Sequence, residues 1–437
     1  MGLSEQVFQQ AEVLAFRAPP IPIKQGNFMK NIAKLILLFT AGAIFLIGCK
    51  SQPASGIRDI YAGVADVYIL REDYTLWGAG YNRSGQFGSG VPGGEPGITL
   101  INDDAGEPFS DIMSVAAGEN HAVILKTDGT LWGAGDSSFG ELGLGGGRLG
   151  VFTRLKAGAA AIEGVKTIAA GNNSTFYIDK DGSLWASGYN YYGELGIGSR
   201  DQQSSFRKVD SAGQNIKTIA AGIRHTVVLK EDGTLWAAGY NFNGQLGLGD
   251  TLDRNAFSQV RSAGNDVAAV AAGSYHTVIL KKDGSVWTAG SNYWGQLGFT
   301  GMKDELSFIR LSDENGSPLT GIKEIAARGN ITVLLKEDGT LLIAGNYTDT
   351  EGSGETDPEA AAAIMQSAIQ TVRSNFAVLV PEDGGQKMAD VKKIVLGYNS
   401  VYVIDADGRF WAAGSNRYNQ LNLGLDTVTV SSLKLIE

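Results

Sequence analysis

The chain has 437 residues, a formal net charge of −10 and a single cysteine. Because an acidic body repels phosphate backbones, which bind clustered lysine and arginine, nucleic acid is excluded as a partner. One cysteine excludes an intramolecular disulfide and any metal site made from several cysteines.

The first element expected in chain order is an export signal. Residues 1–28 precede a second methionine, Met29, and are interpreted as an over-extended start or an unusual leader. Residues 29–48 combine lysines, the apolar run Leu35 to Ile47 and a small residue before Cys49, which are the parts of a secretory signal. The ending Leu-Ile-Gly-Cys resembles a bacterial lipobox, and this resemblance implies cleavage before Cys49 and lipidation of its thiol. An uncleaved membrane anchor is the alternative, although the run is short for a transmembrane helix.

A short linker follows the expected signal. Residues 49–56 are rich in serine, alanine and glycine and are interpreted as a tether between the lipid and a folded body at residues 57–437. The expected location is therefore a bacterial cell envelope, facing away from the cytoplasm. The lipid on Cys49 would be the only contact with the membrane, since several acyl chains on one residue anchor a protein firmly.

The body repeats one motif seven times, and its fourth copy reads AAGIRHTVVLKEDGTLWAAGYNFNGQLGLG from Ala220. Successive anchor positions are separated by 55, 53, 51, 51, 55 and 69 residues, and Leu342 takes the anchor position in the sixth copy. A period near 50 residues indicates units that cannot bury their apolar faces alone and therefore stack. The anchor tryptophans are interpreted as structural core residues: Trp77, Trp132, Trp185, Trp236, Trp287 and Trp411.

Each copy can be divided into four short strands. In the fourth copy these are expected near Ile216–Ile219, His225–Lys230, Thr234–Ala238 and Phe257–Arg261. An Asp-Gly pair at 232–233 separates the second strand from the third and is a strong hairpin signal. Four antiparallel strands per repeat predict an all-β, seven-bladed β-propeller of four-stranded antiparallel blades.

The sixth copy contains an insertion at residues 347–375. Its alanine-rich centre and Pro358 predict a short helix. The run from Phe376 to Val380 then takes the place of the fourth strand. At the ends of the body, the terminal strands are expected either to meet in one blade or to flank one seam.

The joined pattern A-A-G-x-x-H-T-V-x-L-x-x-D-G-x-[L/V]-W-x-A-G-x-N-x-x-G-Q-L-G strongly resembles the regulator-of-chromosome-condensation repeat, from about Ile57 to Glu437. The resemblance implies a seven-bladed propeller. The family's namesake is a nuclear nucleotide-exchange factor for a small GTPase, a partner that an exported protein would not meet. Secreted members, such as a bacterial β-lactamase inhibitor, use the propeller face to bind a protein.

The candidate chemical residues favour a structural interpretation. His121, His225 and His276 occupy one equivalent position in three repeats, so a propeller separates them into different blades. They are expected to bond to backbone near a strand start. Six of the repeats carry an aspartate in an Asp-Gly turn, where the side chain stabilises the turn. Catalytic and metal-binding signatures were not found, so no catalytic residue, metal or cofactor is predicted.

Strand parity predicts one loop-rich face. If the first strand of each blade runs up, the Ala-Ala-Gly turn and the Tyr-Asn-x-x-Gly-Gln loop both lie at the top. The side chains expected there are Tyr81, Arg83, Asp136, Phe139, Tyr189, Tyr191, Tyr192, Arg224, Tyr240, Phe242, Tyr275, Tyr293, Trp294, Arg417 and Tyr418. Aromatic and arginine side chains are enriched in binding hot spots. Packing between blades is the alternative role for each of them.

These observations predict an exported, lipid-anchored, monomeric module that binds a protein partner without catalysis. A second hypothesis is a glycan-binding or carbohydrate-active envelope protein, in which aromatic rings stack on sugars. Paired carboxylates in the central face would favour the enzyme, and aromatic rings without them would favour the lectin. A third hypothesis is nucleotide-exchange activity like that of the family's namesake, which requires residence in the cytoplasm.

Overall fold

The computed structural model describes residues 56–90, 97–313, 315–347, 373–382, 388 and 391–436. The expected leader, signal peptide, lipidation residue Cys49 and tether up to Ser55 lie outside the described residues. So does most of the insertion in the sixth repeat, with its expected helix. Among the described residues, no helix has the length and apolar character needed to cross a membrane.

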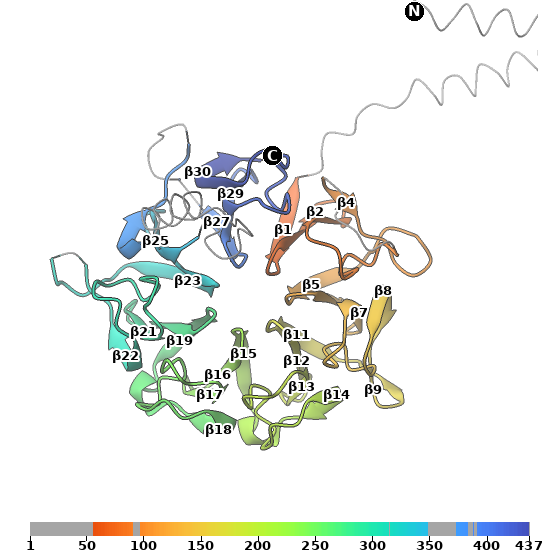
Figure 1. The fold of residues 1–437 in the computed structure, drawn as a ribbon, viewed down its shortest axis with the longest axis horizontal. Coiled ribbons are helices and arrows are strands. Elements are labelled where there is room, and N and C mark those ends of the chain that lie inside the picture. Colours follow the sequence, from red (N-terminus) through yellow and green to blue (C-terminus); the bar gives the residue numbers. More distant parts are fainter. Residues whose placement is uncertain are drawn as a thin grey trace, which may run out of the picture. The chain divides into compact units, whose positions relative to one another are not determined.

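The described part of Gly56–Glu437 forms seven four-stranded antiparallel sheets arranged as blades around a central axis (Figure 1). The predicted all-β, seven-bladed propeller is therefore confirmed. Each blade consists of four strands that are consecutive in the sequence, and the first of the four lies nearest the axis.

The strands have the following bounds. Blade 1 contains β1 (Ile57–Ala62), β2 (Asp66–Arg71), β3 (Leu76–Gly80) and β4 (Thr99–Leu100); blade 2 contains β5 (Ile112–Ala117), β6 (His121–Lys126), β7 (Leu131–Asp136) and β8 (Arg148–Arg154). Blade 3 contains β11 (Val165–Ala170), β12 (Ser174–Asp179), β13 (Leu184–Gly188) and β14 (Gln203–Lys208); blade 4 contains β15 (Ile216–Ala221), β16 (His225–Lys230), β17 (Leu235–Gly239) and β18 (Arg254–Gln259). Blade 5 contains β19 (Val267–Ala272), β20 (His276–Lys281), β21 (Val286–Gly290) and β22 (Glu305–Arg310); blade 6 contains β23 (Ile322–Arg328), β24 (Asn330–Lys336), β25 (Leu341–Asn346) and β26 (Arg373–Val378). Blade 7 contains β27 (Val391–Leu396), β28 (Ser400–Asp405), β29 (Phe410–Ser415) and β30 (Thr429–Leu435).

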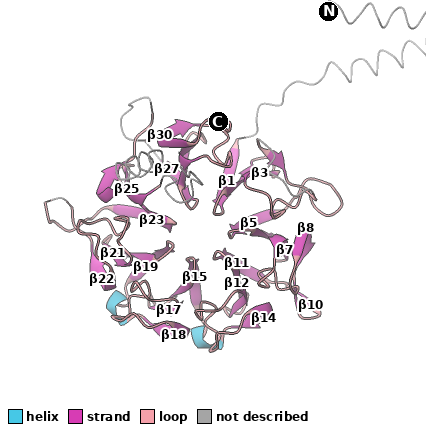
Figure 2. Cartoon of the chain, viewed as in Figure 1, coloured by secondary structure: helices cyan, strands magenta, loops and turns pink. Residues whose placement is uncertain are grey.

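Three small elements lie outside the four-stranded sheets. A hairpin of β9 (Lys156–Ala157) and β10 (Ala160–Ala161) follows blade 2. The 3₁₀ helices η1 (Asp210–Ala212) and η2 (Arg261–Ala263) follow blades 3 and 4 at the outer edge of the ring (Figure 2). The fourth strand of blade 4 was expected to end at Arg261, which instead opens η2.

The Asp-Gly turns form as the sequence predicts. Gly233 has φ +82°, a conformation that glycine adopts without steric cost. Asp232 Oδ1 accepts hydrogen bonds from the backbone nitrogen and the hydroxyl of Thr234, at 2.9 and 2.7 Å. The turn is therefore held by its own side chains, and it sets the register of β16 with β17.

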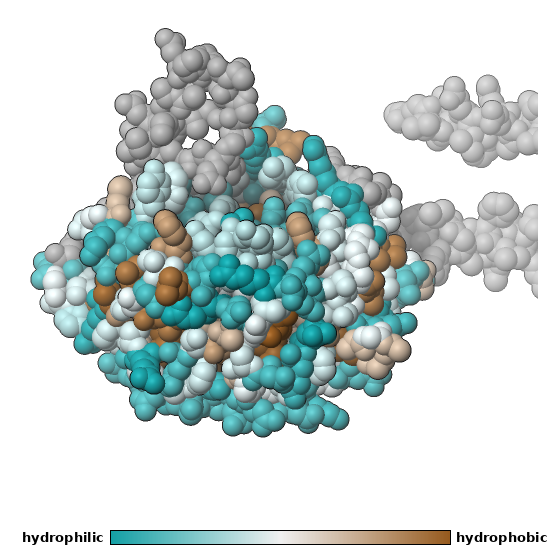
Figure 3. All heavy atoms as spheres, turned by 60° about the horizontal axis from the view of Figure 1, so that its bottom comes forward, coloured by the Kyte–Doolittle hydropathy of each residue, from teal (hydrophilic) through white to brown (hydrophobic). Residues whose placement is uncertain are grey.

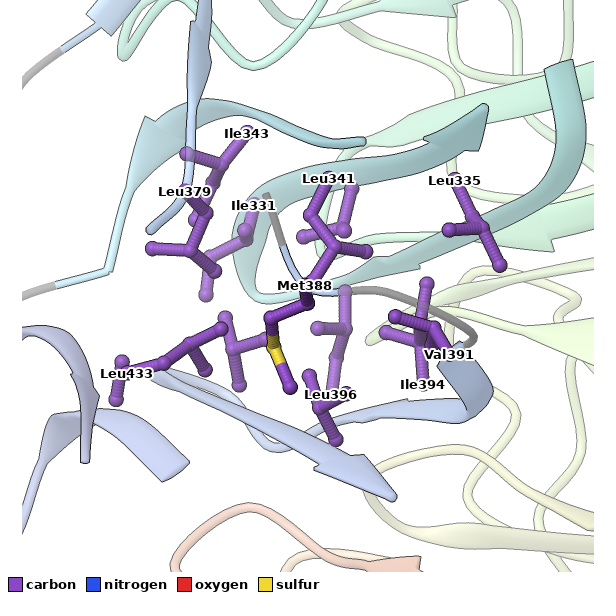
Figure 4. Packing of buried hydrophobic residues seen from close by; sticks show 14 of the residues in the cluster. Ile331, Leu335, Leu341, Ile343, Leu379, Met388, Val391, Ile394, Leu396 and Leu433 are labelled. Atoms are coloured by element: carbon purple, nitrogen blue, oxygen red, sulfur yellow. The ribbon is translucent and has the colours of Figure 1, made fainter. Parts of the chain in front are cut away.

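The core lies between blades. In the described residues, each of the seven junctions between neighbouring blades holds its own cluster of buried apolar side chains. Figure 4 shows the cluster between blades 6 and 7, where Ile331 and Leu335 of β24 face Leu396 of β27 and Leu433 of β30. Blades therefore stabilise one another by apolar contact, as expected of units that cannot fold alone.

The repeated tryptophans differ from the prediction of core residues. All six are half-buried, and they pack against the edges of the junction clusters. In blade 4, Trp236 Nε1 donates to Thr234 Oγ1 at 3.2 Å, and Lys230 Nζ lies 4.3 Å from the ring centroid. The tryptophan thus covers the rim of a junction, where the indole nitrogen can still find a polar partner.

The three histidines are buried and neutral, and the hydrogen bonds of their Nε2 atoms go to side chains. Each Nε2 pairs with a threonine hydroxyl of the next blade, and for His225 this is Thr277 at 3.1 Å. Burial lowers the pKa of His225 to about 4. Each histidine therefore links two blades, and this long-range role could not be seen within one repeat.

The ring closes without a shared strand. β1 belongs to blade 1 and β30 to blade 7, so the terminal strands flank one seam. A cluster containing Ile60, Tyr402 and Phe410 fills this seam, and Lys393 Nζ pairs with Asp59 across it. Side-chain packing therefore connects the first blade to the last, together with a backbone hydrogen bond from Tyr398 N to Val64 O at 3.2 Å.

The insertion expected at residues 347–375 overlaps the propeller at both of its ends. Tyr347 is buried, and its hydroxyl donates to Ser431 O of blade 7 at 2.8 Å. At the other end, β26 already begins at Arg373. Both ends of the expected insertion thus belong to the propeller.

Candidate binding face

Two sets of loops meet at one end of the propeller. One set joins the first strand of each blade to the second, and it contains Arg224. The other set follows the third strand, and it contains Tyr192 and Tyr240. Arg224 Nη1 donates to the Tyr192 hydroxyl at 3.1 Å, and Tyr240 lies 5.9 Å from Tyr275, measured between ring centroids. Residues from both loop sets are therefore neighbours on the same face.

Seven rings on this face form an unbroken series of contacts across blades 2 to 5. We call it the aromatic arc; it consists of Phe139, Tyr189, Tyr191, Tyr192, Tyr240, Phe242 and Tyr275. The centroids of neighbouring rings are 4.8 to 6.5 Å apart. Such edge and offset contacts stabilise an aromatic pair beyond the area that it buries. The arc is thus one continuous surface built by four repeats.

The predicted face contains two further pairs of rings. Tyr293 contacts Trp294 within the blade 5 loop, with ring centroids 5.0 Å apart. Tyr81 contacts Tyr418 across the seam between blades 1 and 7, at 5.2 Å. Both pairs lie beyond the ends of the arc.

The rings form an inner and an outer tier. Tyr191, Phe242 and Tyr293 are 62%, 68% and 65% exposed. Tyr192, Tyr240 and their inner neighbours are half-buried and support the outer rings. On the side of the molecule seen in Figure 3, exposed apolar side chains lie in small patches among hydrophilic ones. Three large, exposed rings at matching positions of adjacent repeats thus form a surface that a partner could cover.

The loops that carry the rings are held by internal hydrogen bonds. In blade 4, Asn241 Oδ1 accepts from the backbone nitrogen of Leu246 at 3.0 Å, and Gln245 Oε1 accepts from that of Asn243 at 3.1 Å. The same pair of bonds recurs in blade 5. A partner would therefore meet a preorganised surface and lose little entropy in ordering it.

Comparison with known protein families identifies the repeat from which the blades are built. The regulator of chromosome condensation (RCC1) repeat matches residues 112–141, 165–194, 216–245 and 267–296, and a second model of the same repeat matches 181–229 and 232–280. The chain is an RCC1-repeat protein. The resemblance noted in the motif is thereby confirmed.

This RCC1-repeat chain is similar to known proteins both in sequence and in structure. It is 33% identical over 298 residues to the ultraviolet-B receptor UVR8 of Arabidopsis thaliana, an alignment that covers 67% of the chain and 65% of the receptor. The structure is similar to human WBSCR16, with a TM-score of 0.67 and 16% identity, covering 83% of the chain and 92% of WBSCR16. It is also similar to yeast RCC1 (Prp20) crystallised with Kap60, with a TM-score of 0.64 and 20% identity, covering 86% and 85%. At these identities the two structures support the fold alone.

Three residues predicted for the face make no contact with the arc among the described interactions. Arg83 and Arg417 are exposed in the loops of blades 1 and 7. Asp136 Oδ1 accepts from the backbone nitrogen and hydroxyl of Ser138, at 3.1 and 2.6 Å, and so shapes its own loop. These three charged residues of the predicted face thus lie in blades 1, 2 and 7, whereas most of its aromatic residues lie together in the arc.

Sequence reasoning missed two carboxylates beneath the arc of this RCC1-repeat chain. Glu141 and Glu194 occupy the glutamine position of the Gly-Gln-Leu-Gly motif, and each accepts a hydrogen bond at 2.9 Å from a backbone nitrogen of the arc, that of Phe139 or Tyr192. Burial raises the pKa of each carboxyl to about 7. These two carboxylates could have been found in the sequence, because Glu replaces Gln at this motif position in two adjacent repeats.

In the described part of the chain, no group of three or more His, Cys, Asp or Glu side chains is placed to hold a metal ion. The histidines lie in separate blades and are engaged with threonines. RCC1-repeat propellers are mostly binding or regulatory proteins.

Proposed function

We propose that this protein is a binding module that recognises a protein partner through the aromatic arc and the adjacent Tyr293–Trp294 pair, without catalysing a reaction. The observation that carries the proposal is the unbroken series of ring contacts across four repeats. Tyrosine, tryptophan and arginine dominate the energetics of protein interfaces because they bury large areas and lose few rotamers.

Arg224 adds a polar anchor to this surface. Its guanidinium carbon lies 4.9 Å from the centroid of the Tyr192 ring, and Nη1 also donates to the Tyr192 hydroxyl. The planar group is therefore held in place and can offer its remaining edge to a carboxylate of a partner. An acidic segment carrying apolar side chains is the complement that this surface favours.

The relatives support the class of function. Yeast RCC1 (Prp20), whose structure is similar to that of this chain, was crystallised bound to another protein, Kap60. The chain spans 65% of the length of the plant receptor. Nucleotide exchange is not part of the proposal, because the expected signal at residues 29–48 directs the chain out of the cytoplasm.

The binding proposal can be tested by removing the three outermost rings. A Tyr191→Ala, Phe242→Ala, Tyr293→Ala variant of the full chain should lose the envelope protein that the wild type retains. Its affinity for that purified protein should fall by about 100-fold or more, since buried hot spots each contribute at least ~2 kcal/mol. Pull-down followed by calorimetry measures both.

The control is Met113→Ala, which removes an exposed apolar side chain from the start of β5, at the opposite end of the axis. It should bind as the wild type does. Equal binding by the triple variant would refute the proposed face. Retention of defined oligosaccharides, but of no protein, would instead favour the lectin hypothesis, since aromatic rings also stack on sugars.

We further propose that the module is exported and anchored by lipid at Cys49, as the Leu-Ile-Gly-Cys motif suggests. A Cys49→Ser variant should move from the membrane fraction to the soluble fraction, because acyl chains contribute roughly 0.8 kcal/mol for each buried methylene. Fractionation with mass spectrometry of the mature N-terminus measures this. Wild-type protein in the cytosol with an unmodified Cys49 would contradict the proposal.

A further inference from the structure

The axis of the propeller contains a cavity of about 320 Å³. Its wall is formed by the first strands of the seven blades and is largely alanine, for example Ala116, Ala170, Ala220 and Ala271. The charged side chains among its lining residues are Arg328 and Lys393, both cationic. A cavity of this size admits a small molecule.

Arg328 occupies a position that is glycine in the other repeats. It is the last residue of β23 and pairs with Ile331, whereas in blade 4 the corresponding residues are Gly222 and His225. A Cβ on Gly222 would overlap the His225 ring, so a histidine repeat cannot accept a side chain there. The sixth repeat lacks the histidine and gains an arginine. The two changes together place the Arg328 guanidinium in the axial cavity.

The guanidinium extends across the axis. Arg328 Nη2 donates to Ala117 O of β5 at 2.8 Å, and blade 2 lies three blades away around the ring. The side chain lines the main cavity and also a smaller one towards the binding face, so it separates them. Among the described residues, this is the one hydrogen bond made by the guanidinium. An arginine carries five N–H donors, so the cavity contains donor capacity in excess of its protein partners.

A nearby carboxyl does not take up these donors. Asp66 is buried in blade 1, and its Oδ2 accepts from the Tyr68 hydroxyl at 3.0 Å. Burial raises the pKa of Asp66 to about 7, and the charge of Arg328 acts in the opposite direction. Among the described residues, Arg328 donates no hydrogen bond to Asp66, so this carboxyl does not occupy the remaining donors of the guanidinium.

The mouth of the cavity at the end opposite the aromatic arc is also basic. The second residue of the innermost strand is an exposed cation in five of the seven blades: Arg58, Lys166, Lys217, Lys323 and Lys392. Lys217 Nζ donates to Ala268 O of the next blade at 3.2 Å, so its side chain follows the rim. At the third position, Asp59 and Glu324 are acidic and Lys393 is basic. In a chain of net charge −10, these cations favour the approach of anions at this end, although the Arg58 guanidinium lies over the Tyr74 ring, 4.5 Å from its centroid.

We propose that the axial cavity binds a small oxyanion, a carboxylate or a phosphate, whose oxygens accept hydrogen bonds from Arg328 and which enters through the basic mouth. Arginine matches both groups because its planar fork can donate two parallel bonds to two oxygens. The site is independent of the aromatic arc and of any protein partner.

The test is calorimetric titration of the full-length protein, at low salt, with inorganic phosphate and separately with succinate. The wild type should bind at least one of the two, and the comparison identifies the preferred oxyanion. Arg328→Gln should weaken that binding at least about tenfold, since a charge-assisted hydrogen bond is lost, while Arg328→Lys should retain part of it. Lys303→Gln, which removes an exposed lysine outside the axial rim, should change nothing.

A second variant covers the case in which Arg328→Gln loses binding only because it does not fold. Ala220→Leu keeps Arg328 and fills the cavity from β15, where the wall residue is half-buried. It should also abolish binding, with unfolding by urea confirming that the variant is folded. Absence of binding to the wild type up to about 10 mM of either anion, or unchanged binding in Arg328→Gln, would overturn the proposal.

Discussion

Replacing Phe410 with alanine should lower the free energy of unfolding by about 3–5 kcal/mol, because a fully buried ring is removed from a packed core. Phe410 is 2% exposed and stacks on Tyr402, with ring centroids 5.9 Å apart, in the cluster that joins blades 7 and 1. This is the seam at which the chain does not continue from one blade to the next. The loss therefore falls on the contact that closes the ring.

Urea unfolding followed by tryptophan fluorescence measures this change. Phe242→Ala is the matched control, because it removes the same ring from a position that is 68% exposed. That variant should stay within roughly 0.5 kcal/mol of the wild type. A loss below about 1 kcal/mol for Phe410→Ala would mean that side-chain packing at the seam contributes little to stability.

Replacing Glu194 with glutamine should stabilise the protein above pH 7 and leave it nearly unchanged near pH 5. Burial raises the pKa of Glu194 to about 7 from its ordinary value of 4.5. The folded state therefore binds the proton more tightly than the unfolded state. Its contribution to stability is full below about pH 4.5 and is lost as the pH rises through 7.

The size of this effect follows from the shift. Each pKa unit corresponds to 1.36 kcal/mol, so ionisation of Glu194 destabilises the fold by up to roughly 3 kcal/mol at pH 8. Glutamine cannot ionise, and Gln245 already makes the equivalent bond in the next repeat. Unfolding by urea at pH 5 and pH 8 measures the difference. Glu231→Gln, on an exposed turn, is the control, and an equal gain at both pH values in Glu194→Gln would contradict the buried-carboxylate explanation.

The blades could be predicted from sequence because their signals are local. Asp-Gly turns such as Asp232-Gly233, β-branched runs and a period near 50 residues each act within one repeat. The fourth strand was the least accurate, since β18 pairs only partly with β17 around a bulge and begins at Arg254, before the expected Phe257. Its bounds depend on the neighbouring blade and on η2, which are outside the local pattern.

Strand parity could predict which loops share a face, but it could not predict the contacts between their side chains. Strand parity gives the residues of the face, yet the contacts that join Tyr192 to Tyr240 and Tyr240 to Tyr275 run between blades, where sequence separation carries no signal. The pairing of His225 with Thr277 could not be predicted for the same reason, because it also runs between two blades. Arg328 was missed because one substitution in a glycine position has meaning only when the seven first strands surround a common axis.

Every blade is one uninterrupted stretch of chain, and Ile57 and Ile436 pack in the same cluster at the seam. The two ends of the propeller therefore meet at a junction of the same kind as those between its other blades. A short linker joining them, with new termini opened between η1 and β15, preserves all of the strand pairs observed. We therefore expect the propeller of residues 57–436 to tolerate circular permutation, and whole blades to be exchangeable between related rings without cutting a sheet.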